Sequence, residues 1–232
     1  MDGIITVVDA KNVLQYLNED KETNEAQQQI AISDCILINK VDLVDENHLN
    51  NLENRIKQLN DVAVCHRTCK SSIDLDLILD IHAYDQSKAL TIDDELNRLV
   101  NNKKKNESTC NENHEHSDSC SSGRSKHLND VKTICLEETK PMDNEKLLQW
   151  LAGMLWEQQS KVDILRMKGV LSIKNEDFKY ALQGVHDIFD LSKTDVQWKD
   201  NEQRLSKVVF IGKNLNMEAL KSGFSQCCSN SN

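Results

Sequence analysis

Residues 35–42 read CILINKVD, and this stretch decides the fold that the sequence predicts. Its first four residues form a continuous apolar run, which is typical of a strand buried on both faces in a parallel sheet. Its last four, Asn39 to Asp42, then lie at the carboxyl end of that strand, where open parallel sheets bind their ligands. The stretch therefore predicts an α/β domain and also the position of its binding site.

Strand-like and helix-like segments alternate around this stretch. The apolar runs at residues 4–8 and 62–64 predict two further strands, the first of them buried. Residues 24–33 look helical, and Asp45 is a good N-cap for a helix whose Leu and Ile residues recur at helical spacing as far as residue 59. Further helices are expected at about residues 75–81 and 92–103. Alternation at this rhythm is typical of βαβ units.

The pattern stops between residues 101 and 130. This segment contains almost no aliphatic residue before Leu128, so it cannot bury a core, and we expect it to be a disordered linker. Order returns at Val131. We therefore divide the chain into an α/β domain at residues 1–100, the linker at 101–130, and a second domain at 131–228.

The second domain has a different pattern. A strand is expected at residues 133–136, and Asp143 is the expected cap of a helix with one apolar stripe. Further strand-like stretches and a closing helix lie near residues 162–173, 180–191, 205–211 and 217–224. Runs of strands with helices at the ends predict a small α+β domain, in which a mainly antiparallel sheet carries its helices on one face.

The residue types of the Asn39–Asp42 segment fit a guanine base. Asp42 is an acceptor-only carboxylate that can take both the ring N–H and the exocyclic amine of guanine, which adenine does not offer. The amide of Asn39 can accept from the base and tie neighbouring loops together, and the stem of Lys40 can lie against the flat ring. The alternative is a polar turn that matches by chance. A loop one strand later, Thr68–Ser71, is either a second contact to the base or a plain turn.

The printed sequence contains no G-x-x-x-x-G-K-[ST] segment. Such a loop supplies the backbone N–H groups that hold phosphates and the hydroxyl that holds magnesium. We therefore expect no catalytic residue in this chain, and magnesium only where such a loop is supplied.

Composition limits the classes of partner. The 38 Asp and Glu residues outnumber the 28 Lys and Arg residues, and the net charge of −10 disfavours nucleic acid and anionic membranes. The first ten residues, MDGIITVVDA, do not resemble a signal peptide, and no apolar stretch is long enough to span a membrane. Eight cysteines in a chain of this length do not form a disulfide scaffold. We expect a cytoplasmic or nuclear protein.

The linker carries five possible metal ligands. They are Cys110, His114, His116, Cys120 and His127. Thiolate and imidazole groups on a mobile chain can wrap a tetrahedral zinc ion, but their spacing matches no defined zinc finger. The tract is therefore either a weak, exchangeable zinc site or a plain spacer.

Several blocks of the sequence resemble one known family. The segments at residues 2–12, 24–44 and 75–85 resemble successive blocks of the CobW GTPase domain. In the second domain, the matching pieces are residues 165–169, 182–186, Trp198, Arg204 and residues 209–215. The resemblance is strongest to the eukaryotic zinc-regulated GTPase metalloprotein activators. It implies the remainder of a parallel-sheet, P-loop-type GTPase domain, followed by a CobW C-terminal domain.

In that family, GTP turnover is coupled to the delivery of a metal, usually zinc, to a client metalloprotein. The resemblance places guanine recognition on Asn39, Lys40 and Asp42. It also places the family's phosphate-binding loop and its Cys-x-Cys-Cys metal motif upstream of the block that starts at Asp2, so we expect a chain that is truncated at its N-terminus and complete at its C-terminus. The alternative is a non-catalytic module, whose C-terminal domain binds the client and whose linker buffers zinc.

The second domain contains further polar candidates. A client or metal surface could include Arg166, Lys168, Gln183, His186 and Trp198. His186 follows a buried-looking strand segment, so a histidine whose hydrogen bonds are satisfied in or near the sheet is the favoured explanation for it.

Overall fold

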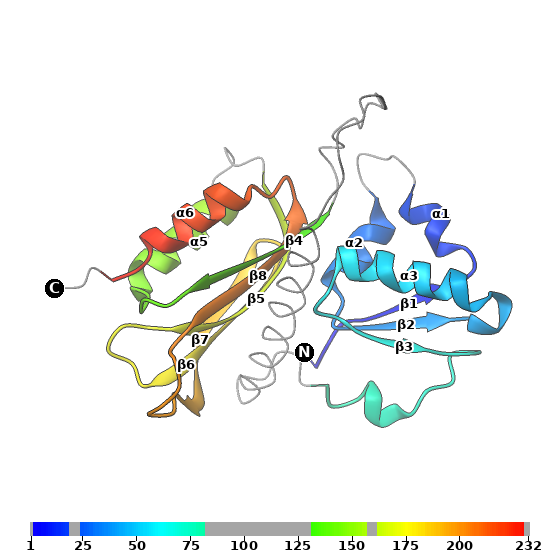
Figure 1. Cartoon of the computed structure of the whole chain (residues 1–232), viewed down its shortest axis with the longest axis horizontal. Coiled ribbons are helices and arrows are strands. Elements are labelled where there is room, and N and C mark those ends of the chain that lie inside the picture. Colours follow the sequence, from blue (N-terminus) through cyan, green and yellow to red (C-terminus); the bar gives the residue numbers. More distant parts are fainter. Residues whose placement is uncertain (1, 19–23, 82–130, 157–161, 230–232) are drawn as a thin grey trace, which may run out of the picture.

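The computed structural model describes residues 2–18, 24–81, 131–156 and 162–229 of the 232-residue chain. These residues form two sheets, each with its own helices (Figure 1). The helix expected near residues 92–103 and the linker at 101–130 lie outside the described residues. Within the described ranges, no helix has the length and apolar character needed to cross a membrane.

The N-terminal sheet has three parallel strands in the order β1-β2-β3. They are β1 (Ile5–Asp9), β2 (Cys35–Asn39) and β3 (Val64–Arg67). The helices are α1 (Val13–Leu17), α2 (Glu25–Ile32) and α3 (Glu46–Leu59), with 3-10 turns η1 (Val41–Leu43) and η2 (Leu75–Leu77). Strand β2 lies between the other two, and Cys35 to Ile38 are all buried, so the predicted α/β class is confirmed.

Helix α3 forms as its sequence predicts. The Asp45 carboxylate accepts a hydrogen bond from the backbone N–H of His48 at 2.7 Å, which satisfies one of the unpaired donors of the first turn. The apolar stripe of this helix is buried, and consists of Leu49, Leu52, Ile56 and Leu59. This burial fixes the loop between β2 and α3, which carries the Asn39–Asp42 segment.

Three details of the N-terminal domain differ from the prediction. Strand β1 is not buried on both faces, because it forms one edge of the described sheet and leaves Ile5 39% and Val7 55% exposed. The third strand starts at Val64 because the Asn60 side chain accepts from two backbone N–H groups, at residues 62 and 63, and holds that segment in a turn. The helix expected at residues 75–81 is only the turn η2, whose leucines are exposed and so gain nothing from a longer helix.

The C-terminal domain is a five-stranded antiparallel sheet in the order β4-β8-β5-β6-β7. The strands are β4 (Lys132–Glu138), β5 (Asp163–Ser172), β6 (Phe178–Val185), β7 (Ile188–Gln197) and β8 (Ser206–Lys213). Helices α5 (Asn144–Trp156) and α6 (Met217–Gln226) lie together on one face of the sheet (Figure 1). The predicted α+β architecture is confirmed.

The single strand expected at residues 180–191 is wrong. The chain turns there, so that β6 ends at Val185 and β7 begins at Ile188. His186 adopts a φ of 54°, the left-handed conformation that a two-residue hairpin turn requires. The two turn residues, His186 and Asp187, are neither glycine nor proline, so the turn carries only a weak signal in the sequence.

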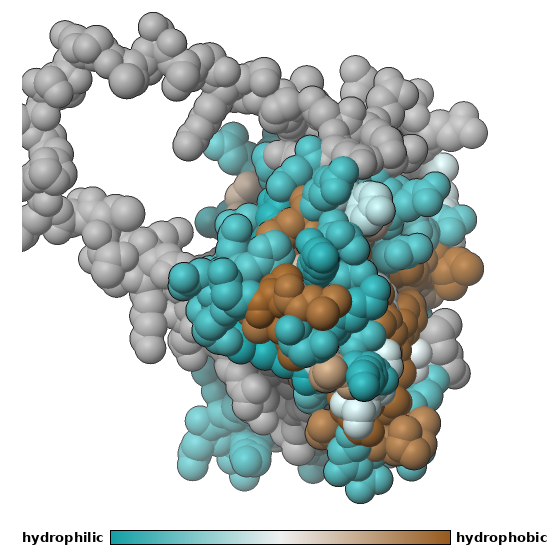
Figure 2. All heavy atoms as spheres, turned by 90° about the vertical axis from the view of Figure 1, so that its right-hand side faces the viewer, coloured by the Kyte–Doolittle hydropathy of each residue, from teal (hydrophilic) through white to brown (hydrophobic). Residues whose placement is uncertain are grey.

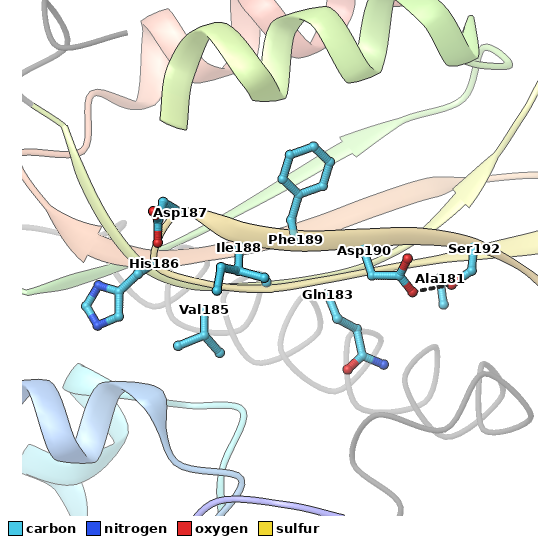
Figure 3. A pocket seen from close by; sticks show the side chains of 10 residues that line it. Ala181, Gln183, Val185, His186, Asp187, Ile188, Phe189, Asp190 and Ser192 are labelled. Atoms are coloured by element: carbon cyan, nitrogen blue, oxygen red, sulfur yellow. Dashed lines mark hydrogen bonds between the residues drawn. The ribbon is translucent and has the colours of Figure 1, made fainter. Parts of the chain in front are cut away.

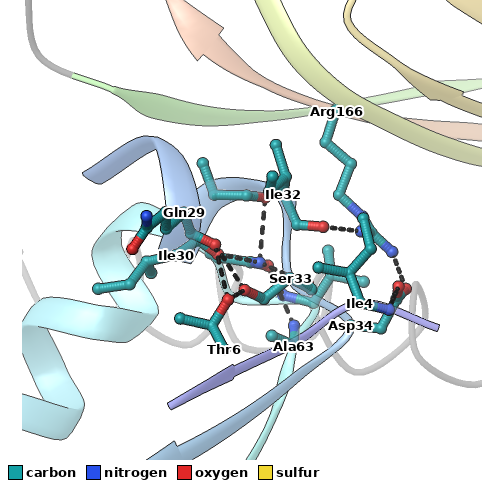
Figure 4. A network of polar contacts seen from close by, with 12 residues as sticks. Ile4, Thr6, Gln29, Ile30, Ile32, Ser33, Asp34, Ala63 and Arg166 are labelled. Carbon is teal, nitrogen blue, oxygen red and sulfur yellow. Dashed lines mark hydrogen bonds and ion pairs between the residues drawn. The ribbon is translucent and has the colours of Figure 1, made fainter. Parts of the chain in front are cut away.

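The two sheets share buried contacts. Residues of both domains, such as Val8 and Ile36 in the first and Leu165 and Ile211 in the second, belong to one apolar cluster. Across the same boundary, the guanidinium of Arg166 in β5 donates to the backbone oxygen of Ile32 and to the carboxylate of Asp34 (Figure 4). The two domains therefore contact each other through polar as well as apolar groups.

Candidate functional site

The carboxyl ends of the three parallel strands bring the candidate residues together. Asp9 ends β1 and Asn39 ends β2, and the two are register partners. The loop that follows β3 lies beside them, because Thr68 donates its backbone N–H to the backbone oxygen of Ile38 at 2.8 Å. Figure 2 views the molecule from this end, where the surface is mainly hydrophilic with smaller apolar patches.

Asn39 anchors the neighbouring loop. Its Oδ1 accepts from the backbone N–H of Ser71 at 2.9 Å and from the hydroxyl of Thr68 at 3.3 Å. Its Nδ2 donates to the Ser71 hydroxyl at 2.9 Å. These contacts match the loop-tying role considered for Asn39, and they hold the 68–71 loop beside the end of β2.

Lys40 is held in a defined position by both its backbone and its side chain. The backbone is left-handed, with a φ of 63°, which costs a non-glycine residue about 1–2 kcal/mol and therefore needs compensation. The ammonium donates to Oδ2 of Asp9 at 2.7 Å, and both groups are partly exposed. This hydrogen bond lowers the pKa of the Asp9 carboxyl below its ordinary value of 3.8. The pair therefore links Lys40, just after β2, to the end of β1.

Asp42 lies in the short turn η1 with an exposed side chain. The backbone N–H of Val41, next to it, points to the backbone oxygen of Thr68 at 3.4 Å, so the two loops run side by side. The thiol of Cys69 lies 3.1 Å from Oδ1 of Asp42. The carboxylate is thus accessible at the surface, with acceptor capacity left for a ligand.

The structure adds two residues to the candidate site, Asp9 and Cys69. Asp9 carries a signal in the sequence, because it is the polar residue that ends an apolar strand parallel to β2. Cys69 carries no such signal, since its contact with Asp42 depends on how two loops lie against each other. The five linker residues proposed as zinc ligands lie outside the described residues.

Among the described residues, no group of three or more His, Cys, Asp or Glu side chains is arranged to hold a metal ion. Of the cysteines in this part of the chain, Cys227 and Cys228 are adjacent in the sequence, and both are buried. Burial raises the pKa of the Cys65 and Cys227 thiols to about 11, and it also raises the pKa of Cys228. Thiols in such surroundings stay protonated at neutral pH, and so are poor metal ligands. Cys35 is buried in β2, as expected.

A second concave site lies on strands β6 and β7 (Figure 3). It is a largely apolar pocket of about 550 Å³, within the size range of small-molecule sites. Gln183 and His186 line it, and Ile188 at the hairpin is 76% exposed. The other three polar candidates of this domain are buried within the structure. They are Arg166, Lys168 and Trp198.

Comparison with known proteins gives matches over both domains. Residues 1–67 match the family model of the CobW/HypB/UreG nucleotide-binding domain, and residues 131–228 match that of the cobalamin synthesis protein cobW C-terminal domain. The zinc-regulated GTPase metalloprotein activator 1 of Schizosaccharomyces pombe is 28% identical over 230 residues, which cover 93% of this chain and 53% of that protein. The protein with the same description in Saccharomyces cerevisiae is 27% identical over 258 residues, covering 95% of this chain and 54% of that protein. The chain thus spans about half the length of these curated relatives.

Solved structures support the fold. The crystal structure of the Zn(II)-bound YjiA GTPase from E. coli superposes with a TM-score of 0.68 at 24% identity, covering 99% of this chain and 62% of that one. A Zn(II)-bound triple mutant of the same GTPase gives a TM-score of 0.66 at 24% identity, covering 98% and 61%. At this identity the likeness concerns the fold alone.

Proposed function

Since this chain belongs to the CobW family, we propose that its N-terminal domain binds the guanine base of GTP and that the protein serves as a zinc metallochaperone. The relatives described as zinc-regulated GTPase metalloprotein activators support this proposal. So does the order of the two family models along the chain. We also propose the division into residues 1–100, a linker at 101–130, and residues 131–228.

One observation carries the guanine assignment. Asn39, Lys40 and Asp42 follow one another at the carboxyl end of β2, and each has a different neighbour. The side chain of Asn39 is hydrogen-bonded to the 68–71 loop, and that of Lys40 to Asp9. We therefore assign recognition of the base to the carboxylate of Asp42. Its two oxygens can accept the ring N–H and the exocyclic amine of guanine together. Adenine offers no such pair of donors on one edge.

Hydrolysis and magnesium binding are not assigned to residues of this chain. The printed sequence has no G-x-x-x-x-G-K-[ST] segment, and the three residues of the base site have no role in phosphoryl transfer. Zinc is the cargo of the proposed chaperone. Its proposed ligands are Cys110, His114, His116, Cys120 and His127.

The client is proposed to be a metalloprotein that contacts the C-terminal domain. The pocket on β6 and β7 and the exposed Ile188 support a contact at this hairpin, because exposed apolar side chains around a pocket are common at protein interfaces. A non-catalytic module that binds the client and buffers zinc is the second candidate. The Cys and His residues of the 101–130 tract and the apolar pocket at the β6–β7 hairpin are the features that would serve such a module.

The guanine assignment is tested by Asp42→Asn. We expect this change to weaken GDP binding by about 1.5–3 kcal/mol, the contribution of a charge-assisted hydrogen bond, and to leave the weaker ADP binding unchanged. Xanthosine diphosphate, which has a carbonyl where guanine has its amine, should bind the variant better than it binds the original chain. Asp76→Asn, which removes an exposed carboxylate outside both loops, is the matched control. Equal small losses for GDP and ADP would show that residues 39–42 are merely a turn.

A further inference from the structure

Cys69 and Asp42 belong to two different loops, yet their side chains are in contact. We propose that Cys69 is a positioning residue for guanine recognition: its thiol donates a hydrogen bond to Asp42 and fixes the direction of the carboxylate that reads the base. This inference rests on the proposed binding of guanine at Asp42. It gives Cys69 a role that neither the family resemblance nor the sequence pattern assigns.

The first support is the geometry of the contact. Sγ of Cys69 lies 3.1 Å from Oδ1 of Asp42, within hydrogen-bond range for a sulfur donor. Asp42 is exposed and sits in a 3-10 turn of three residues. A carboxylate in such a position can rotate freely unless a neighbour restrains it. Fixing a freely rotating side chain when the ligand binds costs conformational entropy and so weakens binding. The thiol supplies this restraint before the base arrives.

The second support is that the backbone fixes the thiol. Thr68, the residue before Cys69, is buried and donates its N–H to the oxygen of Ile38. On the other side, Ser72 donates its N–H to the oxygen of Cys69 at 3.0 Å, across Lys70 and Ser71, which have φ values of 52° and 55°. The loop is therefore a tight turn. It is anchored to β2 on one side and closed on itself on the other.

The third support is protonation. A thiol can donate only while it carries its proton, and the hydrogen bond to Asp42 raises the pKa of Cys69 above its ordinary value of 9.0. At neutral pH the group is thus an S–H donor facing an ionised acceptor. The thiolate that would react with metals or oxidants is disfavoured.

The hydrogen bond leaves room for the base. An ionised carboxylate has about four acceptor positions, and guanine would use two of them, one on each oxygen. Cys69 uses one more. The thiol and the base therefore bind the same carboxylate together, and the thiol does not have to leave when the nucleotide enters.

The main test measures GDP and ADP binding to the full chain by ligand-observed NMR titration. Cys69→Ala should raise the Kd for GDP about three- to fivefold, the size expected for one neutral donor, and should leave ADP unchanged. Cys69→Ser keeps a donor at the same position and should restore binding to within about twofold of the original chain. Ser72→Ala, in the same loop, is the control for a general disturbance of the turn.

A second measurement needs no nucleotide. Asp42→Asn removes the charge that raises the pKa of Cys69, so alkylation of Cys69 by iodoacetamide at pH 8, followed by residue-resolved mass spectrometry, should become faster. Saturating GDP should slow alkylation in the original chain. Glutathione added to the same samples is the reference for the reactivity of the reagent.

The outcomes separate this inference from the guanine assignment. Tighter GDP binding by Cys69→Ala would mean that the thiol competes with the base, and would overturn the inference. Unchanged GDP binding by Cys69→Ala, together with weak binding by Asp42→Asn, would leave the guanine site in place and reject the positioning role. GDP binding that does not depend on Asp42 would overturn both. If Asp42→Asn leaves the alkylation rate of Cys69 unchanged, the contact itself is disproved.

Discussion

Arg166 of β5 and Asp34, the residue before β2, form a buried ion pair that joins the two sheets (Figure 4). The two side chains are only 5% and 4% exposed. Oδ2 of the same carboxylate accepts the backbone N–H of Ile4 at 2.9 Å, and the guanidinium also reaches the backbone oxygen of Ile32. One arginine of the C-terminal domain therefore contacts the start of the strand whose far end carries the candidate base site.

Arg166→Met should destabilise the whole chain. The change leaves the Asp34 carboxylate buried without its cation, and breaking a buried pair in this way costs about 3–5 kcal/mol. Urea unfolding should be followed by tryptophan fluorescence, because all three tryptophans lie in the C-terminal domain, and by far-UV circular dichroism, which reports both domains. We expect a lower midpoint, and transitions that no longer coincide once the domains are uncoupled.

The control for this measurement is Arg204→Met. Arg204 pairs with Asp177 at 2.9 Å on the surface, with side chains 44% and 81% exposed, so its loss should cost no more than about 1 kcal/mol. A similar small effect for Arg166→Met would show that the buried pair does not couple the domains.

The contact between Arg166 and Asp34 also shows what the sequence could not predict. The two residues are 132 positions apart, and neither stands in a motif that points to the other. Strand β2, by contrast, was predictable. A run of four consecutive apolar residues is typical of a strand that is covered on both faces of a parallel sheet. Local patterns determined where the elements form, whereas contacts between elements depended on the packing of the whole domain.

The residues of the candidate site also differ in how far the sequence alone could point to them. Asn39 and Asp42 could be proposed from the sequence because their residue types and their place after a buried strand suit one ligand. Cys69 could not, because the loop that carries it has no pattern of its own. His186 illustrates a third case, in which a residue without glycine's freedom adopts a left-handed turn and hides the boundary between two strands.

The pair between Lys40 and Asp9 should give a pH-dependent contribution to stability. Its carboxyl has a lowered pKa in the folded state, so the contribution is fully present above the ordinary value of 3.8 and is lost as the pH falls through the lower folded value. Because both groups are largely solvated, Asp9→Asn should cost less than about 1 kcal/mol at pH 7. The difference between the variant and the original chain should be smaller at pH 3 than at pH 7, and should vanish only below the lowered pKa of the folded state. Urea midpoints at the two pH values test this, and a constant difference would contradict it.

The chain as printed should show no GTP hydrolysis above the buffer rate. Phosphoryl transfer depends on backbone donors, a lysine and magnesium placed around the phosphates, and the printed sequence contains no segment of the type that supplies them. Phosphate release from GTP should be measured with and without magnesium, on preparations of the original chain and of Asp42→Asn. Magnesium-dependent turnover that disappears in the variant would disprove this prediction.

Zinc binding should be confined to residues 101–130 and should be weak. The ligands proposed there are Cys110, His114, His116, Cys120 and His127. We expect at most about one zinc ion per chain, because binding must order a tract whose composition disfavours a fixed structure. Affinity should fall as the pH drops and the histidines take up protons. Replacement of all five residues by serine should abolish this binding, as measured by competition with a chelating dye.

The same variant should unfold like the original chain, because the apolar clusters of the described residues are formed without these five side chains. Circular dichroism melts of both proteins provide the control. If the variant keeps its zinc, the site lies elsewhere, and Cys65, Cys69, Cys227 and Cys228 become the residues to replace. All four are at a disadvantage as ligands, because a metal would have to displace a tightly held proton. Burial raises the pKa values of Cys65, Cys227 and Cys228, and the hydrogen bond to Asp42 raises that of Cys69. A drop in melting temperature would instead show that the 101–130 segment takes part in folding, and would contradict its role as a separate zinc-binding tract.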